Sequence, residues 1–509
     1  MGLERDEKAI LTGAALIAVF SLGVGALCLH LGDAWGKKAS SGTRRNFWSG
    51  PISLLFGGTS TAEMAHGWVK WSLPILVAGC VATFIKGQVL MSWGFKYKVE
   101  MTGFEYKESF EYNIDTSVSA LWLYDNEVFA VLLAALSLLW PHIKLLYALV
   151  LYYLPLNVTY KSRVSLYLWL DTLGRWNHLD IIVVNFMLST VDLNSGFFEA
   201  YAYTLDGSYV YCMAVIMSQG IGHLVIEETR VAMRNAEAQE EGALEDDEKV
   251  AFLRDKEGTV GHTPYGSVPA VPKKSIQDAP EDDRSWALCE VAPTIFPRAA
   301  LYVPAMQLIS FTLYITALAL TSYITFYTLP LDLEYDDLAL TISETSTKCM
   351  NSHADKWYDR VGVIFIGLLV LCFTTIVPAV RMLCQAWQWF GRLSPKQRCT
   401  LDHVVEVATL WSALDVSLFA GFLVALGVKD LTKDIIECPW TEDPCFYIEM
   451  DLENGFMVGL AAVLMGYIVN ITMAHIDKTI QAQKTYQISL NEKSPLISLN
   501  DLNAVGVMA

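Results

Sequence analysis

Nine apolar runs, each long enough to cross a bilayer as a helix of about 20 residues, constrain this chain more than any other feature. They lie in residues 1–31, 70–93, 126–154, 164–191, 207–226, 299–329, 359–389, 402–428 and 452–475. With 53% hydrophobic residues and a mean hydropathy of +0.35, the chain of 509 residues is too apolar for an ordinary soluble protein. We therefore predict an all-α polytopic membrane protein.

The order of these runs divides the chain into six predicted segments. They are an N-terminal transmembrane helix (1–31), a cytosolic segment (32–69), a first four-helix module (70–226), an acidic disordered cytosolic linker (227–298), a second four-helix module (299–475) and a cytosolic tail (476–509). The linker is predicted to be disordered because it carries much of the net charge of −18. Basic residues near the ends of the runs place the N-terminus outside and the C-terminus in the cytosol.

Three segments between the apolar runs have the pattern of half-buried strands. "FKYKVEMTGFEYKESFEYN", "LDLEYDDLALTIS" and "CFYIEMD" alternate bulky apolar residues with charged ones at period two. Because a single hairpin is marginally stable, we expect the two outer excursions of each module to pair with one another. The prediction is a small β-structure on the outer face of each module.

Two motifs occur once in each module, in the same order, at a shift of roughly 235 to 237 positions. The pattern [ST]-x-x-x-P-x-x-[KR] places Ser137, Pro141 and Lys144 in one module and Thr374, Pro378 and Arg381 in the other. The pattern [DE]-x4-W-x-x-L-D places Asp171, Trp176 and Asp180 in one and Glu406, Trp411 and Asp415 in the other. Such recurrence indicates an internal repeat.

These motifs predict kinked helices that carry buried charges. Pro141 and Pro378 remove a backbone donor and kink their helices. A basic side chain costs about 2.5–3.5 kcal/mol at the centre of a membrane helix, so it needs an acid, a wet cavity or an escape to the interface. Lys144 lies at about the same depth in the membrane as Asp171, and Arg381 lies at about the same depth as Glu406.

We therefore predict two ion pairs, Lys144 with Asp171 and Arg381 with Glu406. Asp180 and Asp415 lie deeper in the membrane. The two acids of each motif are nine positions apart and half a turn out of phase, which argues against a shared carboxylate dyad. Two interpretations stay open: a polar latch that fixes helix packing, or the lining of a path for a polar or amphipathic molecule.

No pattern in the chain predicts an enzyme, a cofactor or a metal site. The sequence has no nucleophile elbow, no H-E-x-x-H and no P-loop, and its nine histidines do not cluster at metal-ligand spacing. We interpret His178 and His223 as packing residues, with a role as ligands or proton relays as the alternative. Cys438 and Cys445 are a candidate disulfide, and the acidic balance excludes a broad nucleic-acid interface.

The run "LGRWNHLDIIVV", which follows a helix with proline and a basic residue and recurs as "TLWSALDVSLF", resembles the paraquat-inducible protein A family. The resemblance covers residues 70–226 and 299–475 and implies two four-helix modules with an outer sheet. In bacteria that family is implicated in moving lipids between membranes as the integral partner of MCE-domain proteins. This chain lacks the C-x-x-C pairs of the bacterial zinc ribbons, so we do not expect it to bind zinc as the bacterial members do.

The resemblance implies a role in lipid transport or membrane lipid homeostasis, with membrane lipids and another membrane or membrane-bridging protein as partners. A secondary transporter is an alternative, although the sequence shows no helix plainly broken at its centre. A non-transporting auxiliary or scaffold subunit is another. "EKSPLI" resembles an acidic dileucine signal through Glu492, Leu496 and Ile497, which favours a divergent eukaryotic member in a plasma, endolysosomal or vacuolar membrane.

Overall fold

The computed structural model describes residues 60–493 apart from residues 102–103, 124–126, 157, 195–197, 259–286, 330–332, 352–356 and 436–446. The helix predicted in residues 1–31 and the candidate disulfide of Cys438 and Cys445 lie outside the described residues, as do Leu496 and Ile497. Below, residues 60–258 are the first half and residues 287–493 are the second half.

The two halves follow similar sequences of elements. The first half comprises α3 (Thr61–Met64), α4 (Gly67–Val89), β1 (Trp93–Met101), β2 (Phe104–Tyr112), α5 (Ile114–Leu123), α6 (Glu127–Leu133), η1 (Ala134–Leu139), α7 (Trp140–Tyr153), α8 (Tyr160–Gly174), η2 (Arg175–His178), α9 (Leu179–Thr190), β3 (Asp192–Asn194), β4 (Phe198–Thr204) and α10 (Asp206–Gly258). The second half comprises α11 (Leu288–Ile295), α12 (Ala299–Ala319), β5 (Tyr323–Leu329), β6 (Leu333–Leu340), α13 (Ile342–Asn351), α14 (Trp357–Leu371), η4 (Cys372–Ile376), α15 (Val377–Phe390), α16 (Pro395–Trp411), α17 (Leu414–Ile435), β7 (Tyr447–Leu452) and α18 (Asn454–Lys493).

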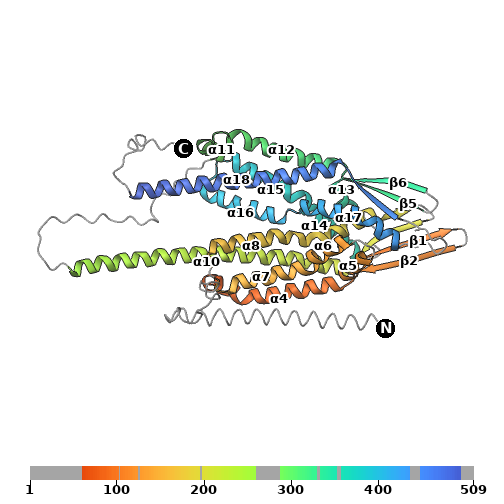
Figure 1. Cartoon of the computed structure of the whole chain (residues 1–509), viewed down its shortest axis with the longest axis horizontal. Coiled ribbons are helices and arrows are strands. Elements are labelled where there is room, and N and C mark those ends of the chain that lie inside the picture. The colour runs from red at the N-terminus through yellow and green to blue at the C-terminus, as the bar shows by residue number, and fades with distance from the viewer. Residues whose placement is uncertain are drawn as a thin grey trace.

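Long apolar helices run along the molecule, and both sheets lie at one end of it (Figure 1). Seven of the described helices are long and apolar enough to cross a membrane. An eighth segment, Tyr160–Thr190, also runs the length of the molecule, because it connects the end of α7 far from the sheets to β3 in a sheet. The chain is a multi-pass, mostly helical membrane protein, as predicted.

Both sheets are antiparallel. The first has the strand order β2-β1-β4-β3 and the second the order β6-β5-β7. Strand β1 pairs with β2 of the same excursion and with β4 of the next, for example Tyr97 opposite Ala200, and β5 pairs with both β6 and β7. The predicted pairing between the two outer excursions of each half is confirmed.

The junctions between helices and sheets are alike in the two halves. The Ser92 carbonyl accepts a hydrogen bond from the connection that precedes α10, and the Ser322 carbonyl accepts one from the connection that precedes α18, both at 2.9 Å. Gly207 and Gly455 follow these connections. A Cβ at Gly207 would lie 2.5 Å from the Leu90 carbonyl oxygen, and a Cβ at Gly455 would lie 2.5 Å from the Thr321 carbonyl oxygen. Both positions therefore require glycine for a close backbone approach.

Two predicted element boundaries are wrong. The helix expected over residues 299–329 ends at Ala319, and its last part forms β5, because the run "YITFYTL" is rich in the β-branched and aromatic residues that strands favour. The linker expected to be disordered from residue 227 is helical to Gly258, since α10 continues through a stretch of Ala, Glu, Arg and Lys, all strong helix formers.

The helices that carry the motifs are distorted or broken. Pro141 and Pro378 each follow a π-helical segment, η1 and η4, which is where the sequence predicts a kink. The segment Tyr160–Thr190 is interrupted by the 3₁₀ turn η2, and Ser412 has an extended backbone between α16 and α17. The expectation that no helix is broken is therefore wrong. Backbone carbonyls at these breaks bond side chains: the Thr172 carbonyl accepts from Arg175 Nε at 3.1 Å, and the Ser412 carbonyl accepts from Arg175 Nη1 at 3.3 Å.

The two halves share one hydrophobic core. The ring of Trp176 packs edge-on against Phe419 at 5.1 Å between centroids, and the ring of Phe186 packs in the same way against Tyr323 at 4.9 Å. Because Trp176 lies within the break at η2 and Phe186 lies in α9 after it, the broken segment of the first half is at the contact with the second half. That position brings its polar residues against α17 and α18.

Candidate functional site

Lys144 and Asp171 form a buried ion pair in the first half. The Lys144 ammonium donates to Asp171 Oδ1 at 2.6 Å and to Gln219 Oε1 at 2.9 Å, and the two charged residues are only 3% and 1% exposed. The pair predicted from depth is thus present, with a third partner on α10 that the sequence motifs do not contain. A charge at this depth needs an opposite charge beside it, because desolvation of a lone ion is expensive.

Two glycines make room for this ion pair. A Cβ at Gly174 on α8 would overlap Lys144 Nζ, and a Cβ at Gly222 on α10 would lie 2.5 Å from Asp171 Oδ1. Gly222 belongs to the run "SQGIGH", whose glycines the sequence favours as a site of close helix packing. Here the small residue admits a carboxylate between α8 and α10.

Asp180 is bound to the π-helical segment of the first half. Ser137 Oγ donates to Asp180 Oδ1 at 2.5 Å. The Ser137 carbonyl, which loses its helical partner because Pro141 has no N–H, accepts from Gln88 Nε2 at 2.8 Å and from the Tyr211 hydroxyl at 3.3 Å. The kink and the deep acid are thus parts of one hydrogen-bonded unit that joins four segments of the first half.

Asp415, in the matching position of the second half, has different partners. Its Oδ2 lies 3.3 Å from the Arg175 guanidinium and accepts from the Tyr467 hydroxyl at 2.7 Å, and Arg175 donates to that same hydroxyl at 2.7 Å. Arg175 also donates to the Ser412 carbonyl at 3.3 Å, where the helix is broken. Since Arg175 belongs to η2, this cluster joins the two halves through charged groups.

The predicted ion pair between Arg381 and Glu406 is wrong. Both carboxylate oxygens of Glu406 accept from Arg230 of α10, at 2.6 and 2.5 Å. Arg381 instead lies beside Asp415 and Tyr467, and a Cβ at Gly466 would be 2.9 Å from its guanidinium. The physical reason is that α10 continues as a helix past residue 226, where the sequence predicts its end, and so brings Arg230 to Glu406.

The motif tryptophans and the two central histidines contribute to the contact between the halves. Trp411 Nε1 donates to His223 Nε2 at 3.2 Å, so a tryptophan of the second half is bonded to α10 of the first. The His178 ring bonds the Arg175 carbonyl at 2.8 Å through Nδ1 and packs on Phe373. Among the described residues, no group of three or more His, Cys, Asp or Glu side chains is arranged to hold a metal ion.

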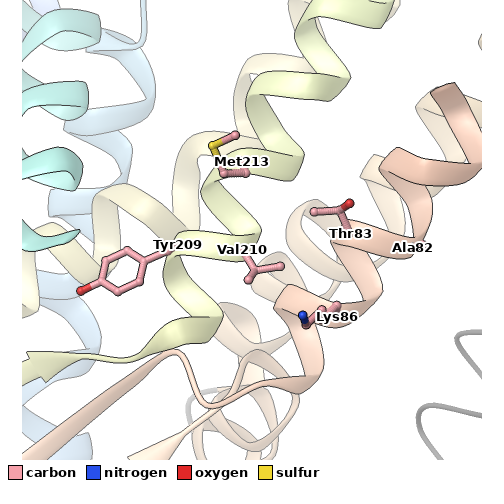
Figure 2. Close-up of a pocket in the computed structure, with 6 residues that line it drawn as sticks. All are labelled: Ala82, Thr83, Lys86, Tyr209, Val210 and Met213. Carbon is pink, nitrogen blue, oxygen red and sulfur yellow. The ribbon is translucent and has the colours of Figure 1, made fainter. Parts of the chain in front are cut away.

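Two hollows accompany these clusters. A cavity of about 20 Å³ lies at the contact between the halves, and its polar lining consists of Arg175, Arg381, Ser412, Asp415 and Tyr467. An open groove of about 450 Å³ lies between α4 and α10, lined by Ala82, Thr83, Lys86, Tyr209, Val210 and Met213. Figure 2 shows these six side chains on the two adjacent helices, with Lys86 near the end of α4.

Sequence reasoning missed four partners in these clusters, namely Gln219, Arg230, Tyr467 and the pairing role of Arg175. Arg175 stands within the repeated motif and has no basic counterpart in the second half, where Leu410 precedes the tryptophan. This difference between the two motifs indicates that Arg175 has a role that is not repeated in the second half. Gln219 and Tyr467 offered none, because one polar residue in an apolar helix is common.

Residues 62–222 match the family described as paraquat-inducible protein A. The matched segment runs from α3 into α10 and contains Lys144, Asp171, Asp180 and Arg175. The resemblance predicted from the motifs is thereby confirmed for the first half, and the match does not extend over the second. No curated protein and no solved structure matches the chain.

Proposed function

The chain carries a paraquat-inducible protein A family domain over residues 62–222, and from this we propose that it acts in lipid transport or membrane lipid homeostasis. The groove between α4 and α10 is the observation on which the proposal depends. Its volume of about 450 Å³ falls in the range of ligand sites, and most of its lining is apolar. Met213 is 49% exposed, so the groove faces the surroundings of the helix bundle.

Lys86 makes the groove amphipathic, with a charged end and an apolar remainder, as a phospholipid is. It lies in the last turn of α4, a few residues before β1, so its ammonium is near the end of the membrane span at the sheets. A basic side chain at that depth extends toward the interface, where it meets phosphate groups. An acyl chain along Val210 and Met213 with a phosphate at Lys86 satisfies both parts of the groove.

We further propose that the second half is an internal duplicate of the first. Support comes from the two recurring motifs, the matching helix-to-sheet junctions at Ser92 and Ser322, and the π-helical segments before Pro141 and Pro378. Each half then supplies one copy of a common unit, oriented in the same direction. The two sheets share one end of the molecule, as parallel repeats require (Figure 1).

We place the sheets outside and the ends of α10 and α18 in the cytosol of a plasma, endolysosomal or vacuolar membrane. The basic residues near the opposite end from the sheets, such as Arg163, Lys396 and Arg398, favour this orientation. The acidic dileucine pattern adjoining Glu492, which stands in the last turn of α18, is consistent with a cytosolic tail.

Native mass spectrometry of the full chain in mild detergent tests the lipid proposal. Met213→Trp fills the groove, and Leu308→Trp places the same bulk on an exposed position of α12 as the matched control. Lipid adducts should be present in the wild-type protein and the control and reduced in Met213→Trp. In vesicles, the same variant should slow transfer of a fluorescent phospholipid. Equal adducts in all three folded proteins would reject the groove as a lipid site.

A secondary transporter remains the second candidate, favoured by the broken helices at η2 and Ser412. Discontinuous helices beside buried charges are the usual site of ion and substrate binding in such proteins. The scaffold alternative gains nothing specific from the geometry. An Asp180→Asn/Asp415→Asn variant separates the two candidates, because a transporter should lose solute uptake by it while a lipid groove at α4 and α10 keeps its adducts.

A further inference from the structure

The small cavity at the contact between the halves has an unusual charge balance. Arg175 comes from η2, Arg381 from α15, Asp415 from α17 and Tyr467 from α18. Arg175 and Arg381 are 4% and 7% exposed, so both side chains are largely buried. The volume of about 20 Å³ has room for one species of the size of a water molecule.

The described carboxylates do not neutralise the buried cations here. Asp415 interacts electrostatically with both arginines, while the other acid near Arg175 is Asp171, which forms its own ion pair with Lys144. The three cations are Lys144, Arg175 and Arg381. Of the carboxylates that the structure describes, only two, those of Asp171 and Asp415, lie beside them. Asp180 does not change this balance, since its interactions are with Ser137 and Tyr211, away from the cavity.

The geometry of Arg381 points into this cavity. Its Nε is buried and has no hydrogen-bond partner among the residues that the structure describes. Gly466 lets the guanidinium approach α18, where any larger residue would contact it. Tyr467 is already committed, because its hydroxyl accepts from Arg175 and donates to Asp415. Arg381 is thus the donor that remains available to a ligand.

We propose that the cavity binds one small monovalent inorganic anion, of the class of chloride, between Arg381 and Arg175. Binding an anion removes an uncompensated buried charge, which is otherwise strongly unfavourable. Helix α17 begins at Leu414, which lines the cavity, so the positive end of the helix dipole also favours an anion there. The volume excludes phosphate esters and carboxylate metabolites, so this site is separate from the proposed lipid groove and does not depend on it.

Thermal unfolding of the full chain in detergent measures the binding. Chloride is exchanged for gluconate at constant ionic strength, so that general screening of surface charges is unchanged. The midpoint of the wild-type protein should rise with chloride and saturate, as expected for a ligand that binds only the folded state. A midpoint that is identical in both salts at every concentration overturns the proposal.

Three variants assign the effect to this cavity. Arg381→Met should abolish the response to chloride, and in gluconate it should unfold at or above the wild-type midpoint because the unpaired charge is gone. Asp415→Asn removes the competing carboxylate, so it should lower the chloride concentration for half the effect by about tenfold or more. Arg392→Met, an exposed position in an ion pair with Glu290, should respond as the wild-type protein does.

A loss of the chloride response in Asp415→Asn, or its persistence in Arg381→Met, would contradict the site. If Arg381→Met does not fold, the unmodified protein still decides the question. Crystals grown in bromide should give an anomalous peak within hydrogen-bonding distance of the Arg381 guanidinium, and the absence of that peak overturns the proposal. Lipid adducts should be unchanged by the exchange of anions, so failure here leaves the lipid proposal intact.

Discussion

Lys144 and Arg381 each stand three residues after a proline, in the α-helix that follows a π-helical segment, yet their surroundings differ. Lys144 is closed in by Asp171, Gln219 and two glycines, with its charge balanced. Arg381 faces a cavity and shares its nearest acid, Asp415, with an arginine of the other half. The same local sequence therefore supports a sealed ion pair in one half and an open cationic site in the other.

The difference is set by the last helix of each half rather than by the motifs. Helix α10 supplies Gln219 to Lys144 and continues far enough to bring Arg230 to Glu406. Helix α18 supplies Tyr467 and Gly466 to the cavity. Because Arg230 of α10 binds Glu406, Arg381 has no acid of its own among the described residues of the second half. Its nearest acid, Asp415, also pairs with Arg175. We expect the following perturbations to separate the two arrangements.

The largest effect should come from Lys144→Met, which leaves Asp171 buried without its counterion. Breaking one side of a fully buried ion pair is expected to reduce the free energy of unfolding by about 3–5 kcal/mol. Unfolding in mixed micelles measures it. The double variant Lys144→Met/Asp171→Leu should regain most of the loss. Arg381→Met should have a much smaller effect, and an equal loss in that variant would refute the contrast between the halves.

Arg175→Met should have the next largest effect, because it removes the guanidinium that joins Asp415, Tyr467 and the Ser412 carbonyl. Hydrogen bonds to charged groups are worth about 1.5–3 kcal/mol, and we expect a loss of about 2 kcal/mol because Asp415 is partly exposed. The halves should also unfold less cooperatively in a calorimetric scan. Arg175→Lys keeps the charge without the forked geometry and should recover only part of the loss. A single, unshifted transition in Arg175→Met would count against this link.

Gly222→Ala tests how tightly the first half encloses its ion pair. The added methyl group would lie 2.5 Å from Asp171 Oδ1, and such overpacking is expected to cost about 1–3 kcal/mol. Gly220, on the same helix, is a matched control because a Cβ there meets nothing within 4 Å. Gly220→Ala should be neutral or stabilising by up to about 1 kcal/mol through helix propensity. Equal melting temperatures for the two variants would show that Asp171 can move away.

Glu406→Gln should have a smaller effect than any change at Lys144. Its partner Arg230 is 25% exposed in its side chain and Glu406 is 26% exposed, so solvent screens much of the attraction. We expect a loss of about 0.5–1 kcal/mol in the free energy of unfolding. Arg230→Met should give a similar value, and the double variant should add little to either. A loss of several kcal/mol would mean that Glu406 also supports Arg381.

The sequence predicted those features that depend on short-range chemistry. Period-two alternation located β1, β2, β6 and β7, and the prolines located both π-helical segments. Depth along neighbouring helices was enough to pair Lys144 with Asp171, because the two helices are joined by a short connection. Each of these features is signalled by residues close together in the chain, whereas the long-range pairing of β5 with β7 was predicted only because a lone hairpin is marginally stable.

What the sequence did not predict depends on contacts between distant elements. Glu406 lies 176 positions from Arg230, and the sequence predicts Arg230 to be part of a disordered linker, so it does not indicate that Arg230 competes with Arg381 for Glu406. The breaks at η2 and Ser412 are stabilised by partners elsewhere: the Ala413 N–H donates to the Phe373 carbonyl at 3.0 Å, for example. No local propensity signals a break of that kind, since its hydrogen bonds are satisfied only in the assembled bundle.

The smallest effect should come from an ion pair of the second half that lies outside the membrane spans. Arg392 contacts Glu290 of α11 at 2.7 Å, and this hydrogen bond, with a second from the Ala287 N–H, lowers the pKa of Glu290 below its ordinary value of 4.5. A lowered pKa stabilises the folded state at pH values above 4.5, and this contribution disappears as the pH falls through the lowered value.

Glu290→Gln should therefore unfold slightly below the wild-type protein at pH 7, and the two midpoints should converge under acid conditions below pH 4.5. The effect is small because the Arg392 side chain is mostly exposed and the pair is screened by water and salt. High salt should shrink the difference further, whereas it should leave the loss in Lys144→Met nearly unchanged. A salt-independent difference at Glu290 would place this pair in the same class as the buried one, and burial would then not explain why the two halves treat their charges differently.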